Sequence, residues 1–127
     1  MNLVPFNPKD LPAPVGGYSQ AVEISGHKNV LFISGQIAET LAGHVPVGFE
    51  EQCVMIWGHI LNLLKAANMT IENVVKINTY LTNQGQAEIN RTVRNRFLGS
   101  HRPALTVIVV QTLDTRWLLE IEAVAAK

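Results

Sequence analysis

The sequence lacks several features that would point to particular classes of protein. Its 127 residues carry ten basic and ten acidic side chains and therefore no net charge. Long-range electrostatics does not draw a neutral chain to phosphate backbones or anionic membranes, so nucleic acid is not an expected partner. The single cysteine, Cys53, cannot form an internal disulfide or a thiolate zinc cluster, which excludes a disulfide-stabilised secreted domain.

Long apolar runs are also missing. The runs at residues 30–33 and 107–110 are the size of strands, and no run in the sequence approaches the roughly 20 residues that cross a bilayer. Residues 1–14 contain four prolines and mixed charge in place of a basic start and an apolar leader. We therefore expect a cytoplasmic protein with no membrane partner.

The chain does contain enough apolar side chains for one core. Hydrophobic residues make up 47% of the sequence and charged residues only 16%, unlike the composition of disordered chains. A chain of this length forms one domain by default. We expect a single domain over residues 1–127, without internal repeats or linkers.

Hydrophobic periodicity predicts an α+β fold with the element order β-β-α-β-α-β-β. Apolar residues at three- and four-residue steps predict helices at residues 49–67 and 86–98. In the second helix Ile89, Val93 and Phe97 form the expected apolar stripe, and Arg94 lies away from it. Strands are expected at residues 18–24, 30–34, 74–81, 104–110 and 117–125, the first two as a hairpin. This grouping favours helices on one face of a mixed sheet.

Two carboxylates stand in the last predicted strand. Glu120 and Glu122 alternate with apolar residues, so they point to the same face of the sheet. One interpretation is that both are incidental acids on a solvated face. The other is that one carboxylate acts as a general base that activates water, while the second pairs with Lys76 or an arginine. The spacing alone does not assign these two roles.

The predicted strand at residues 74–81 also has two distinct faces. Lys76, Asn78 and Tyr80 form a polar face, whereas Val75, Ile77 and Leu81 form an apolar one. Such polar faces are ordinary surface unless the sheet packs against other subunits. Packing of that kind would give a small chain a cleft.

Three other groups of residues are weaker candidates. The four histidines show no ligand spacing, so no metal site is expected. Cys53 lies on the apolar stripe of the first helix, where a core position is expected. The local arginine cluster lacks interleaved aromatic residues, and we interpret it as a solvated helix face or an interface salt-bridge set. It comprises Arg91, Arg94, Arg96 and Arg102.

Short motifs along nearly the whole chain resemble the YjgF/Rid family of reactive intermediate deaminases, also called L-PSP endoribonucleases. These motifs are GYSQAV at residues 17–22, ISGQI at 33–37, Gln52 with Asn62, Val75-Lys76, Asn90, Pro103-Ala104 and EIEA at 120–123. The resemblance implies a chorismate-mutase-like subunit in a homotrimer, with inward-facing sheets and a small-molecule cleft at each subunit interface. Active members hydrolyse an imine or enamine to a 2-keto acid and ammonia without a cofactor.

The resemblance also implies roles for individual residues. Glu120 matches the acid that positions the attacking water, and Tyr18, Ser34, Gly35 and Asn90 match residues that line the cleft. These roles follow from the family motifs and not from the spacing of the residues.

Two positions depart from the family pattern. Leu105 follows the Pro-Ala pair, where the deaminases carry an arginine that binds the substrate carboxylate through two hydrogen bonds. Leucine has no donor, and losing one partner of a desolvated ion pair costs roughly 3 to 5 kcal/mol. In addition, Gly16-Gly17 replaces the usual Gly-Pro before Tyr18.

Three functions follow from these observations. The first is a trimeric protein that binds a small metabolite, less acidic or more apolar than a 2-imino acid, with 2-imino acid deamination lost or strongly reduced because of Leu105. The second is a cofactor-independent imine or enamine deaminase, or another small-molecule hydrolase, that uses Glu120. The third is an RNA-binding, endoribonuclease-like protein that uses the arginine cluster, which the neutral net charge disfavours.

Overall fold

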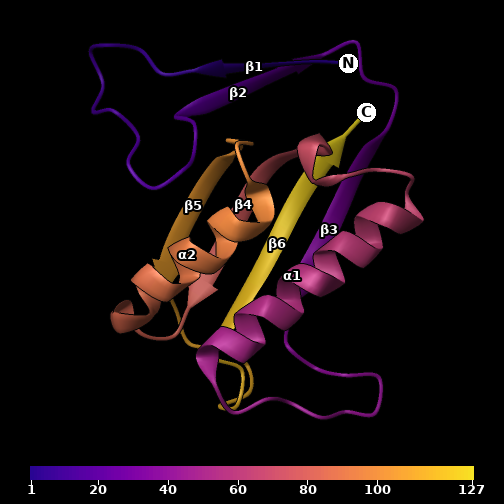
Figure 1. The fold of residues 1–127 in the computed structure, drawn as a ribbon, viewed down its shortest axis with the longest axis vertical. Coiled ribbons are helices and arrows are strands. Elements are labelled where there is room, and N and C mark those ends of the chain that lie inside the picture. The colour runs from indigo at the N-terminus through magenta and orange to yellow at the C-terminus, as the bar shows by residue number, and fades with distance from the viewer.

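The computed structural model describes residues 1–127 as an α+β fold (Figure 1). The strands are β1 (Asn2–Phe6), β2 (Ala21–Ser25), β3 (Val30–Gln36), β4 (Val74–Leu81), β5 (Ala104–Val109) and β6 (Leu119–Ala126). The helices are α1 (Phe49–Ala66) and α2 (Ala87–Leu98), with short 3-10 turns at η1 (Ile71–Asn73) and η2 (Gln84–Gln86). No helix is both long enough and apolar enough to cross a membrane.

Four of the strands form a mixed sheet in the order β3-β6-β4-β5. Strand β6 is antiparallel to both of its neighbours, whereas β5 runs parallel to β4. Both helices lie on one face of this sheet (Figure 1). The predicted α+β arrangement, with two helices on one face of a mixed sheet, is confirmed.

Helix α1 supplies much of the core. Its buried residues are Gln52, Cys53, Ile56, Trp57, Ile60 and Leu64. Trp57 stacks on Phe97 of α2, with ring centroids 5.9 Å apart. Asn68, predicted to end this helix, has a left-handed φ of 56°, which asparagine tolerates just after a helix. Cys53 is in the core as expected. Leu63, which the three- and four-residue spacing also places on the apolar stripe, is exposed instead.

The predicted hairpin between residues 18–24 and 30–34 is wrong. Strand β2 pairs with β1, a strand that was not predicted, and β3 pairs with β6. Pro5 obscured β1, because proline is rare inside strands, but both strands of a two-stranded sheet are edges that tolerate it. Pairing with β6 instead places Ile33 opposite Ala123 and extends the core.

The faces of two elements also differ from the prediction. In β4 the register shifts between Val74 and Lys76, so Val74 rather than Val75 is fully buried. In α2, Ile89 is exposed and Arg94 is buried, so the expectation that Arg94 lies on a solvated face is wrong. The physical reason is that the segment before β2 folds over this side of α2 and accepts a hydrogen bond from the guanidinium.

Candidate functional site

One pocket lies between the segment before β2, helix α2 and strand β5. It measures about 240 Å³, and its lining includes Tyr18, Asn90 and Leu105, three of the predicted site residues. Leu105 pairs in register with the buried Ile77, so it faces the helix-covered side of the sheet. The remaining lining residues are Val15, Ala87, Arg91, Arg94 and Val107.

Two glycines shape the segment that carries Tyr18. Gly16 and Gly17 have φ angles of +110° and +92°, which side-chain-bearing residues rarely adopt. Proline, expected at position 17 from the family resemblance, holds φ at about −65° and does not fit this backbone. The side chains of Arg94 and Asn95 both donate to the Gly16 carbonyl and fasten the segment to α2.

Arg94 is a buried cation without a carboxylate partner. The residue is only 3% exposed, and its guanidinium donates one hydrogen bond, to the Gly16 carbonyl. Its Nε is buried without a partner, and so is Oδ1 of Asn90 in the same pocket. Burial lowers the pKa of the Arg94 guanidinium, and the positive charge of Arg91 lowers it further. One wall of this pocket is therefore positively charged, although the chain as a whole is neutral.

A second group of predicted residues meets where β3 lies beside β6. Ser34 and Gly35 occupy an irregularity in the β3–β6 register. Glu120 packs against Gly35 so closely that a Cβ there would lie 1.8 Å from Glu120 Oε2. Glycine therefore leaves room for this carboxylate, which has neither a hydrogen-bond donor nor an ion-pair partner of its own within the chain.

Glu122, in contrast, is held by side chains of β4. Tyr80 Oη and Asn78 Nδ2 donate to Glu122 Oε1 at 2.6 and 2.9 Å. These hydrogen bonds, chiefly the one from Tyr80, hold the pKa of Glu122 below its usual value. Lys76 donates instead to a threonine hydroxyl at 3.1 Å and pairs with neither glutamate. Of the two carboxylates, Glu120 is therefore the one left free to accept a proton from water.

The two groups of residues lie at opposite edges of the sheet in one chain. Ser34 and Gly35 are on the edge strand β3 and Leu105 is on the edge strand β5, with β6 and β4 between them. Glu120 points to the open face, because it alternates with buried residues of β6, whereas Leu105 faces the helices. A small molecule cannot contact Glu120 and Leu105 of the same chain.

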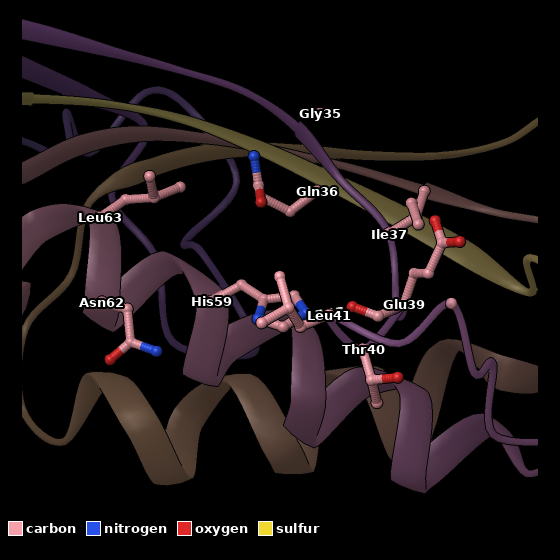
Figure 2. Close-up of a pocket in the computed structure, with 10 residues that line it drawn as sticks. Gly35, Gln36, Ile37, Glu39, Thr40, Leu41, His59, Asn62 and Leu63 are labelled. Atoms are coloured by element: carbon pink, nitrogen blue, oxygen red, sulfur yellow. Dashed lines mark hydrogen bonds between the residues drawn. The ribbon is translucent and has the colours of Figure 1, made fainter.

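A more open hollow lies between the segment after β3 and helix α1 (Figure 2). It measures about 660 Å³, and its lining includes Gly35 together with His59 and Asn62 of α1. His59 Nε2 is 3.0 Å from the carbonyl oxygen of Glu39. The chain contains no cluster of three or more His, Cys, Asp or Glu side chains that could hold a metal ion.

Sequence comparisons place the chain among known proteins. The family model described as Endoribonuclease L-PSP matches residues 8–127. A RutC family protein from Aquifex aeolicus is 39% identical over 119 residues, which cover 91% of this chain and 93% of that protein. Protein HMF1 from Saccharomyces cerevisiae is 31% identical over 98% of this chain and 95% of its own length.

Solved structures share the fold over the same length. The structure of YyfB, a Rid-family protein from Yersinia pestis, matches with a TM-score of 0.87 and 29% identity, and both chains are covered completely. RidA from Psychrobacter matches with a TM-score of 0.74 and 30% identity over 91% of this chain and 93% of its own. The chain therefore belongs to the L-PSP endoribonuclease family, which is the YjgF/Rid family that its motifs resemble.

Proposed function

We propose that this chain is a Rid-type protein that binds a small metabolite in a cleft between copies of itself, with deamination of 2-imino acids lost or strongly reduced. The observation that carries the proposal is Leu105, which lines the pocket beside Tyr18 and Asn90. An arginine at this position would bind a carboxylate through two hydrogen bonds, and leucine offers none. The expected loss is about a hundred- to several-thousand-fold in binding.

The separation of the two groups of site residues supports a cleft between copies. In a homotrimer whose β5 edge approaches the β3 edge of the next copy, Leu105 of one chain would face Glu120 of its neighbour. The open face of the sheet supports the same assembly, because Phe32 on that face is 78% exposed. The group around Leu105 lacks a carboxylate to activate water, and the group around Glu120 lacks the pocket that would hold the substrate.

The chemistry that such a cleft would support is hydrolysis without a cofactor. Glu120 would accept a proton from water as the water oxygen adds to an imine carbon, and it would return that proton to the imine nitrogen. The hydroxyl proton of the resulting amino alcohol would then pass to the nitrogen as the C–N bond breaks, which releases ammonia and leaves a carbonyl group. The lack of a partner for Glu120 within the chain suits this role, whereas Glu122 is already held by Tyr80 and Asn78. Imines without a carboxylate would not need an arginine at position 105.

Binding of RNA has less support. The arginine cluster would have to present its charges to phosphate groups, but Arg94 is buried. Arg96 Nη2 also lies 3.9 Å from Glu50 Oε1, and this carboxylate offsets part of the charge of Arg96. The exposed basic surface is therefore smaller than the sequence indicates.

The test of this proposal is ammonia release from 2-iminopropionate by the wild type and by Leu105→Arg. We expect the variant to exceed the wild type by about a hundred-fold or more, because the arginine supplies the missing carboxylate contact. Adding Glu120→Gln should abolish that gain. Leu113→Arg is a matched control, since it adds the same charge at an exposed leucine outside the pocket. A wild type as active as Leu105→Arg would contradict the proposal.

A further inference from the structure

The loop between β1 and β2, residues 7–20, is fastened to α2 at one point (Figure 1). The loop contains no helix or strand. Of residues 8–18, only Gly16 makes hydrogen bonds to the chain outside the loop. Its carbonyl accepts one from Arg94 Nη2 and another, at 3.1 Å, from Asn95 Nδ2. A carbonyl oxygen has two lone pairs, so these two donors use both of them.

Packing contributes little to holding this part of the loop. Val15 is 77% exposed and Leu11 is 49% exposed, so neither side chain is anchored in the core. Gly16 and Gly17 have no side chains to pack, and ordering glycine costs more backbone entropy than ordering any other residue. The two hydrogen bonds at the Gly16 carbonyl are therefore the specific interactions that fix the loop against α2.

The fastened segment forms one wall of the pocket beside Leu105. Val15 and Tyr18, on either side of the two glycines, both line that pocket. After Tyr18, the Ser19 N–H donates to the Pro103 carbonyl at 3.0 Å, just before the strand that carries Leu105. Tyr18 thus lies between an anchor on α2 and an anchor beside β5. The position of Tyr18 in the pocket depends on both anchors.

We propose that Arg94 and Asn95 are positioning residues, which clamp the Gly16 carbonyl and thereby hold Tyr18 in place opposite Leu105. This role rests on the proposed function, because it concerns the pocket of the same cleft. A guanidinium suits it, since a charged group donates stronger hydrogen bonds than a neutral one. Replacing a buried charge by an apolar side chain is often neutral or stabilising, so stability alone does not account for a buried arginine here.

The clamp requires glycine at position 17. A Cβ there would lie 2.5 Å from Asn95 Oδ1, and the φ of +92° is one that side-chain-bearing residues rarely adopt. Gly17→Ala should therefore displace Asn95 and loosen the segment that carries Tyr18. Gly26→Ala is the matched control, because Gly26 also has a positive φ, of +67°, but a Cβ there meets nothing within 4 Å.

The first test is amide hydrogen–deuterium exchange of the full chain, which needs no ligand. Arg94→Met should raise the exchange of residues 13–20 by about ten-fold, because one of the two fastening hydrogen bonds is lost. Exchange in β6 should stay at the wild-type rate. Arg94→Lys, which keeps a charged donor, should restore part of the protection. Arg96→Met, on the exposed side of the same helix, should match the wild type.

The same measurement on the glycine variants tests the requirement at position 17. Gly17→Ala should raise the exchange of residues 13–20 as Arg94→Met does, and Gly26→Ala should leave it unchanged. Equal exchange of this segment in the two glycine variants would contradict the clamp.

The second test is the kinetics of 2-iminopropionate hydrolysis in the Leu105→Arg background. Adding Arg94→Met should raise KM by about ten-fold and keep kcat within about two-fold, because a displaced Tyr18 weakens binding and leaves Glu120 in place. A loss of folded protein would instead lower the apparent kcat at an unchanged KM. Because Arg94 acts through Tyr18, Arg94→Met should have no further effect on KM once Tyr18→Ala is present.

Unchanged exchange of residues 13–20 in Arg94→Met would overturn the inference. So would an unchanged KM, or additive effects of Arg94→Met and Tyr18→Ala on KM. If Arg94→Met loosens the loop but Leu105→Arg gains no deamination, the proposed function fails and the clamp on the loop stands. If Leu105→Arg deaminates and Arg94→Met changes neither exchange nor KM, the clamp alone fails.

Discussion

Position 35 requires glycine because of a neighbouring carboxylate and not because of its backbone conformation. An alanine Cβ would lie 1.8 Å from Glu120 Oε2, which is the far end of a flexible side chain. We therefore expect Gly35→Ala to move the carboxylate and leave the strand in place. The free energy of unfolding in urea should change by less than about 1 kcal/mol. Ammonia release in the Leu105→Arg background should fall at least about ten-fold.

Gly58→Ala is the control for this prediction, because a Cβ at Gly58 meets nothing within 4 Å. That variant should keep full activity and gain up to about 1 kcal/mol of stability from the helix propensity of alanine. If Gly35→Ala retains full activity, the close contact with Glu120 has no functional consequence.

The hydrogen bond from Tyr80 to Glu122 makes stability depend on pH. Because the folded-state pKa of Glu122 lies below its usual value of 4.5, the bond stabilises the fold above that pH. This contribution is lost as the pH falls through the folded-state pKa. Tyr80→Phe should therefore lower the free energy of unfolding by about 1 kcal/mol at neutral pH, and the difference should shrink as the pH falls below the usual pKa of a glutamate. Urea titrations of both proteins across this range test it, and a difference independent of pH would contradict it.

At the scale of elements, the helix bounds can be predicted from local sequence patterns. The pairing of strands that are distant in the sequence cannot. The bounds of α1 follow from apolar residues at three- and four-residue steps, and Asn68 ends it as expected. The partners of β2 and β3 depend on contacts between distant segments, and a strand containing Pro5 carries no clear local signal. The short turn at residues 25–28 predicts a hairpin for the same reason, because the sequence shows only neighbours along the chain.

Gln52 of α1 connects two loops from inside the core. Its Nε2 donates to the carbonyl groups of Pro46 and Arg116 at 2.7 and 2.8 Å, and its Oε1 accepts from the Leu118 N–H at 2.9 Å. Gln52→Leu keeps a similar volume but leaves these groups without partners, so we expect a loss of about 2 to 4 kcal/mol in the free energy of unfolding. Urea unfolding measures it.

Asn62→Leu, an exposed position of the same helix, is the matched control for Gln52→Leu and should change stability by less than about 0.5 kcal/mol. Equal effects of the two substitutions would show that the three hydrogen bonds of Gln52 contribute little.

At the scale of the whole molecule, family motifs indicated most of the candidate site residues but not Arg94. Tyr18, Asn90 and Leu105 could be singled out because they fall in or next to matched motifs, and they do line one pocket. Arg94 lies on the polar side of a helical pattern, and its burial depends on a segment more than 70 residues earlier in the chain. The zero net charge of the chain likewise gives no indication that Arg91 and Arg94 form one wall of a pocket.

The oligomeric state tests whether the two groups of site residues can meet. Light scattering coupled to size exclusion should give the wild type a mass about three times 14.0 kDa. Phe32→Asp places a charge on the open sheet face and should lower that mass toward one chain, because an unpaired charge buried in an interface costs several kcal/mol. Leu41→Asp, at an exposed loop position, should remain trimeric.

A monomeric wild type would contradict the cleft between copies. The two groups lie at opposite edges of one sheet, so a chain that cannot associate has no complete site. In the Leu105→Arg background, Phe32→Asp should therefore abolish deaminase activity and also lower the measured mass from that of a trimer. We expect this although Phe32 is not among the residues that we assign to substrate binding or to hydrolysis. Retained activity in a monomer would show that Leu105 and Glu120 do not act in one cleft.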